Sequence, residues 1–69
     1  SKMNKSDNDI YVMKQIAEEV RNACITAMQE GFQDASMSGL CTDGAVEAAI
    51  GAVQLLNLEK IVRQALKEG

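Results

Sequence analysis

The stretch Ser36-Met37-Ser38-Gly39-Leu40-Cys41-Thr42-Asp43-Gly44 separates two helix-forming parts of a 69-residue chain. Its small, polar and glycine residues favour turns and helix ends over helix interiors. On both sides of it, apolar residues recur at spacings of three and four, as they do in amphipathic helices. The sequence therefore predicts an all-α fold, in which an antiparallel helical hairpin turns between Asp34 and Gly44 and a short third helix closes it.

The part before the turn predicts a helix over about residues 8–35, with Ser6 and Asp9 approximating a capping box at its start. Its apolar stripe starts with bulky side chains and tapers to small ones: Ile10, Met13, Ala17, Val20, Cys24, Ala27 and Gly31. Another backbone can approach closely where the stripe is small. At that end the bulk moves to the flank, to Ile16, Met28 and Phe32.

The part after the turn predicts a second helix over about residues 44–56, capped by Thr42 or Asp43. One stripe of this helix is bulky and consists of Val46, Ala49, Ile50 and Val53. The other stripe is small and consists of Ala45, Ala48, Gly51 and Ala52. Because Gly51 costs about 1 kcal/mol relative to alanine in a helix interior, we expect it to make a close packing contact, either within the hairpin or in a dimer.

The apolar pattern changes phase at Asn57, which predicts a new N-cap and a third helix over about residues 58–67. A continuous but kinked helix is the alternative. Glu59 and Arg63 are spaced for a surface ion pair in this helix.

Composition predicts one helical domain over residues 8–69, preceded by a disordered segment 1–7 in which Ser1 and Lys2 are expected to remain from an expression tag. A chain of this length buries only about 60% of its unfolded surface, so its core should be thin. Two cysteines are too few for a secreted disulfide scaffold, and no basic and apolar leader is seen, so we expect a cytoplasmic protein. No apolar run reaches the roughly 18 residues of a membrane-spanning helix.

The net charge is −3, and no Lys or Arg occurs between Arg21 and Lys60. Proteins that bind nucleic acid use clustered Lys and Arg to displace counterions from phosphates. An acidic centre opposes that binding, and we therefore expect no nucleic-acid partner.

The turn invites comparison with a calcium-binding loop, because Asp34, Ser36, Ser38 and Gly39 match its first, third, fifth and sixth positions. The comparison fails at the twelfth position, where a bidentate Glu is required and Ala45 stands. The serines and Asp34 then cap helix ends, and Gly39 supplies a positive φ.

Four turn residues are the remaining candidates for chemistry: Asp34, Cys41, Asp43 and Glu47. Cys41 lies just before a predicted helix N-terminus, which favours ionisation of a thiol, but the chain contains no His to act as its base. Cys24, on the small stripe, is expected to be a buried small apolar residue. We expect no catalytic residue, no cofactor and no metal site, and hence no enzyme.

Some leucine and valine positions recur at helical spacing and cannot all be covered by one short neighbouring helix: Leu55, Leu58, Val62 and Leu66. We expect a second subunit to cover them. The sequence thus predicts a homodimeric helical bundle that acts as a protein-interaction module, a small accessory or regulatory subunit. Two alternatives remain: a dimer that binds a small ligand or metal through carboxylates near the 34–44 turn, and a minor thiol-based catalytic role through Cys41.

The stretch from Ala27 to Val62 resembles short uncharacterised bacterial all-helical proteins, some of which carry an acetyltransferase label. The residues that carry the resemblance are Ser38, Gly39, Leu40 and Cys41, followed by Gly44, Glu47, Ala48 and Ala49. It implies a bacterial all-α protein and transfers no catalytic residue.

Overall fold

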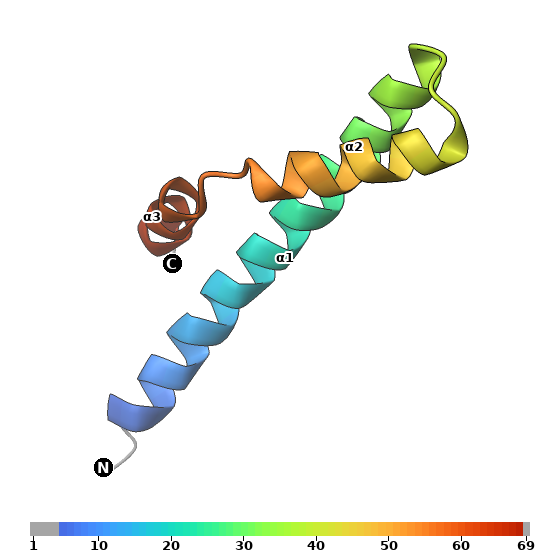
Figure 1. Ribbon diagram of the computed structural model, residues 1–69. Coiled ribbons are helices and arrows are strands. Elements are labelled where there is room, and N and C mark those ends of the chain that lie inside the picture. Colours follow the sequence, from blue (N-terminus) through green and yellow to red (C-terminus); the bar gives the residue numbers. More distant parts are fainter. Residues whose placement is uncertain (1–4, 69) are drawn as a thin grey trace. The chain divides into compact units, whose positions relative to one another are not determined.

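The computed structural model describes the backbone of residues 5–68 and the side chains of residues 9–68. These residues form three helices, α1 (Lys5–Met37), α2 (Thr42–Gln54) and α3 (Leu58–Glu68), and no strand (Figure 1). The predicted all-α fold is confirmed. Helix α1 begins three residues before its predicted start, so residues 5–7 of the predicted disordered segment are helical, while residues 1–4 lie outside the described residues.

The chain divides into two compact units, and α1 contributes to both. The terminal unit contains residues up to Arg21 together with those from Asn57 onward, so it combines the N-terminal part of α1 with α3. The hairpin unit, Asn22–Leu56, combines the C-terminal part of α1 with α2. Within the described part of the chain, no helix has an apolar stretch long enough to cross a membrane.

The hairpin turn follows from a glycine that ends α1. Gly39 has a φ of 95°, its N–H donates to the Ser36 carbonyl at 3.0 Å, and the Leu40 N–H donates to the Ala35 carbonyl at 3.0 Å. This pair of bonds is a Schellman motif, which ends a helix and is easiest with glycine in the left-handed region. The predicted positive φ of Gly39 is confirmed.

The start of α2 differs from the prediction, because its N-cap is Cys41 and not Thr42 or Asp43. The Cys41 carbonyl already accepts the first helical hydrogen bond from the Ala45 N–H at 2.8 Å, and the Cys41 side chain makes no capping bond. Four residues, Ser38 to Cys41, connect the two helices; the Schellman motif uses the first three of them, which leaves Cys41 as the residue next to α2. Asp43 therefore lies in the first turn of α2, beside the positive end of the helix dipole.

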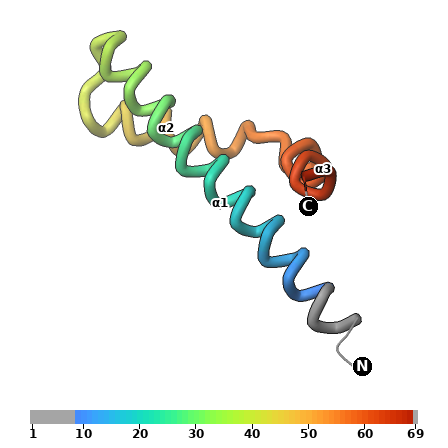
Figure 2. Tube along the Cα trace, turned by 180° about the vertical axis from the view of Figure 1, so that it is seen from behind, coloured from blue at the N-terminus to red at the C-terminus, as the bar shows by residue number. Residues whose placement is uncertain are grey.

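Helix α2 runs back along the C-terminal part of α1 (Figures 1 and 2), and the two helices meet through their smallest residues. A Cβ placed on Gly31 would lie 3.0 Å from the Ala52 Cβ, 3.1 Å from the Ala48 carbonyl oxygen and 3.2 Å from the Ala49 Cα. The buried residues of this unit are all alanines, namely Ala35, Ala45 and Ala49. The contact is therefore a close approach of two backbones.

The face of α2 that packs on α1 combines three alanines of the predicted small stripe, Ala45, Ala48 and Ala52, with Ala49 of the predicted bulky stripe. The large side chains of the bulky stripe are left outside this contact. Val46 and Ile50 are exposed. The close contact expected at Gly51 is absent within the hairpin, since a Cβ there would have nothing within 4 Å among the described residues. Gly31, on the other helix, makes the contact that leaves no room for a side chain.

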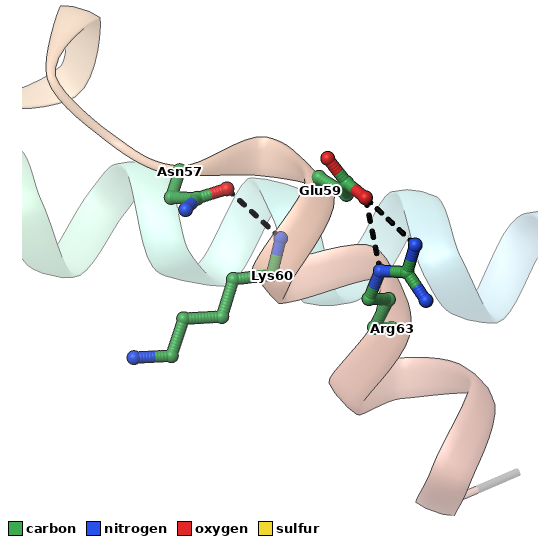
Figure 3. Close-up of polar contacts among 4 residues, drawn as sticks. All are labelled: Asn57, Glu59, Lys60 and Arg63. Atoms are coloured by element: carbon green, nitrogen blue, oxygen red, sulfur yellow. Dashed lines mark hydrogen bonds and ion pairs between the residues drawn. The ribbon is translucent and has the colours of Figure 1, made fainter.

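Helix α2 ends at Gln54 with Leu55 as its C-cap, and α3 begins afresh at Leu58, so the chain breaks here and does not kink. The Lys60 N–H donates to Asn57 Oδ1 at 3.0 Å, which confirms Asn57 as the N-cap (Figure 3). The expected pair also forms, with Arg63 Nη2 2.8 Å from Glu59 Oε2 (Figure 3).

In the terminal unit, α3 packs on the N-terminal part of α1 through Ala65, which is buried. Ala65 and Glu68 of α3 line one small pocket with Gln15, Glu18 and Glu19 of α1. Among the described residues of this unit, Ala65 is the one buried apolar side chain, and none of the larger apolar side chains is fully buried.

The Gly31 contact generates a prediction with a matched control. We expect Gly31→Ala to be less stable than Gly51→Ala by about 1 kcal/mol or more, because both gain helix propensity but only the methyl on Gly31 must displace Ala52 and the α2 backbone by a few tenths of an ångström. Gly51→Ala should raise the free energy of unfolding by up to about 1 kcal/mol, because the helix gains propensity and the space is open. Urea unfolding at one protein concentration measures both, and equal stabilisation by the two substitutions would contradict the close contact.

A second prediction concerns the start of α3. Replacing Asn57 with Ala should destabilise the protein by about 1 kcal/mol, because the Lys60 N–H loses its acceptor. Asn57→Asp should retain most of that stability, since its carboxylate can accept the same bond. Circular dichroism during thermal unfolding compares the two variants, and equal losses would show that the cap contributes nothing.

Candidate functional site

The leucine and valine residues expected to contact a second subunit divide between the two units. Leu55 is the C-cap of α2 and is 86% exposed. Leu58, Val62 and Leu66 are spaced by four along α3 and share one of its faces. Leu58 and Leu66 are each 53% exposed, and Val62 is half-buried. The break before α3 thus removes Leu55 from the helix that carries the other three.

A hollow of about 740 Å³ runs along α3 from Asn57 to Lys67, lined mostly by polar side chains together with Leu66. The Glu59 and Arg63 side chains along it are about three-quarters exposed, so their ion pair contributes little stability. Figure 3 shows this pair on α3, the helix that Asn57 caps. The hollow is charged and exposed, and within the described residues it contains no buried polar side chain.

The hairpin unit carries an apolar groove of about 580 Å³ between α1 and α2. Met28 and Phe32 line it from α1, and Val46 and Ile50 line it from α2, with Ala49 between the two helices. Two neutral polar side chains, Gln29 and Gln33, complete the lining. The exposed fractions are 45% for Met28, 38% for Phe32 and 52% for Ile50, so three large apolar side chains are well exposed in one groove.

The groove was not identified as a site by the sequence analysis. The pattern assigned Met28 and Phe32 to the flank of the first helix, and Val46 and Ile50 to the bulky stripe of the second. The small residues on both helices were the signal that could have predicted the groove. Two helices that meet through alanine and glycine place their larger side chains next to one another at the edge of the contact.

The turn candidates Asp34, Cys41, Asp43 and Glu47 are all exposed. In the described part of the chain, no three Cys, Asp or Glu side chains gather closely enough to hold a metal ion. Both cysteines are free, Cys41 exposed and Cys24 half-buried. The turn therefore presents separate polar groups at the surface, with no assembled set of ligands.

Comparison of the chain with protein-family models, with curated proteins and with solved structures gave no match.

The two cysteines give a direct test of this geometry. We expect iodoacetamide to modify Cys41 several-fold faster than Cys24 in the folded protein, because only the Cys41 thiol is exposed. Mass spectrometry after timed quenching measures each rate, and the Cys24→Ser and Cys41→Ser variants identify the two products. Cys41 modification faster than that of a free peptide thiol would support the thiol-based alternative, and faster modification of Cys24 would contradict the structure.

Proposed function

We propose that this chain is a protein-interaction module, a small accessory or regulatory subunit that acts through its helix faces and works as a homodimer. The observation that carries the proposal is the composition of the core. Among the described residues, the buried apolar side chains are Ala35, Ala45, Ala49 and Ala65. Larger apolar side chains on all three helices are exposed.

A core of alanines supplies little of the apolar burial on which a domain of this length depends. Small domains offset a thin core with disulfides, metals or association with another chain. Cys24 and Cys41 are free and form no disulfide. Association with another chain fits the exposed apolar side chains and gives those side chains a function.

The face of α3 that carries Leu58, Val62 and Leu66 suits a second copy of the chain. A symmetric dimer places the same surface against itself, so that surface must not repel its own copy. The terminal unit meets this condition, because its described side chains include five basic and five acidic residues: Lys14, Arg21, Lys60, Arg63 and Lys67 against Asp9, Glu18, Glu19, Glu59 and Glu68. Two such units can meet without a net electrostatic penalty.

The dimer is tested by replacing Leu58 and Leu66 together with Gln, which keeps helix propensity and removes apolar area. We expect the dimer dissociation constant to rise roughly 10- to 100-fold. Leu55→Gln is the control, because Leu55 is apolar and more exposed but lies outside α3. It should leave the dissociation constant unchanged.

Sedimentation velocity over a range of protein concentrations measures the association, and far-ultraviolet circular dichroism verifies that each variant remains helical. A wild-type protein that stays monomeric throughout the range would remove the homodimer from the proposal. An equal effect of Leu55→Gln would place the interface elsewhere.

A further inference from the structure

The apolar groove of the hairpin unit exposes large apolar side chains from two neighbouring helices, a surface on which an amphipathic helix can bury its apolar face. Its lining residues come from two helices that meet through Gly31 and alanines, so the groove runs between two ridges of larger side chains. Met28 and Phe32 are one turn apart on α1, as are Val46 and Ile50 on α2. A helix in such a groove buries side chains at positions i, i+3 or i+4, and i+7.

The charges around the groove are all of one sign. The hairpin unit, residues 22–56, contains four acidic residues and no Lys or Arg: Glu30, Asp34, Asp43 and Glu47. All four are exposed. Since the unit has no cation of its own, its carboxylates are available to a basic partner.

Two of these carboxylates border the groove and two do not. Asp43 precedes Val46 by three positions, and Glu47 precedes Ile50 by three, so each lies on α2 next to a side chain that lines the groove, outside the lining itself. Glu30 is two residues from both Met28 and Phe32, and Asp34 is two residues from Phe32, a spacing that places them on another face of α1. The groove therefore has an apolar floor and one acidic edge.

We propose that this groove binds a basic amphipathic helix of another protein, with apolar side chains in the groove and Lys or Arg beside Asp43 and Glu47. The inference rests on the proposed function and names the class of partner. A second copy of the hairpin unit fits less well, because it would bring four further carboxylates and no cation. The homodimer face on α3 and this groove are separate surfaces.

The probe is a synthetic peptide of about 18 residues with Leu at the a and d positions of the heptad and Lys at most other positions. A matched peptide carries Glu in place of Lys. Fluorescence anisotropy with the full chain at low salt is expected to show the Lys peptide binding at least about 10-fold more tightly than the Glu peptide, with the difference falling as salt rises. In spectra of the ¹⁵N-labelled chain, the shifted amides should centre on the groove residues.

Two sets of variants test the apolar lining of the groove and the carboxylates beside it separately. Ile50→Lys should weaken binding of the Lys peptide about 10-fold or more, whereas Leu55→Lys, an equal charge change outside the groove, should weaken it about two-fold or less. Asp43→Asn with Glu47→Gln should weaken it about five-fold, and Glu30→Gln with Asp34→Asn, the same change on the other face of α1, about two-fold or less.

Three results would overturn the proposal: equal binding of the two peptides, equal effects of the two double variants, or shifted amides outside the groove. If the amide signals of the groove residues shift with protein concentration in the absence of peptide, the groove binds a second copy of the chain. That result would also overturn the proposal. Dimerisation is measured without peptide through Leu58 and Leu66, so the homodimer and the groove can fail independently.

Discussion

The close approach of α1 and α2 at Gly31 determines most of what surrounds it. With no side chain on Gly31 and only methyl groups on Ala48, Ala49 and Ala52, the two backbones come within van der Waals contact. This approach is too close for leucine or phenylalanine to lie between the helices. The larger side chains are therefore displaced to the edges, where Phe32 and Ile50 line a groove. One steric constraint thus accounts for both the alanine core and the exposed apolar surface.

Backbone chemistry at two points controls where the helices end. Gly39 adopts the left-handed conformation that ends α1, and α2 begins after the four-residue link Ser38 to Cys41, with Cys41 as its N-cap. Asn57 caps α3 with its side chain and separates it from α2. Both devices act within a few residues of sequence, so neither depends on the packing of the helices. They set the lengths of the helices, and the lengths determine which residues can share a face.

The distribution of charge distinguishes the two apolar surfaces. The terminal unit has equal numbers of described basic and acidic side chains, and the face of α3 with Leu58 and Leu66 is compatible with its own copy. The hairpin unit has only carboxylates, so a partner with Lys or Arg complements its groove. The two exposed apolar surfaces therefore differ in the charge around them, and this difference is the reason that different partners are proposed for them.

The helices, the glycine turn, the Asn57 cap and the Glu59–Arg63 pair could all be predicted from the sequence, because each depends on residues no more than about five positions apart. The N-cap of α2 was predicted wrongly, since the Schellman motif extends to Leu40 and leaves Cys41 as the cap. Only the tertiary structure decided which stripe of α2 faces α1. The pattern allowed the bulky or the small side to pack inward, and the contact at Gly31 selects a face of alanines that includes Ala49 of the bulky stripe and omits Gly51 of the small one. The groove depends on that selection, because its two sides come from segments far apart in sequence and only their packing brings Phe32 and Ile50 together.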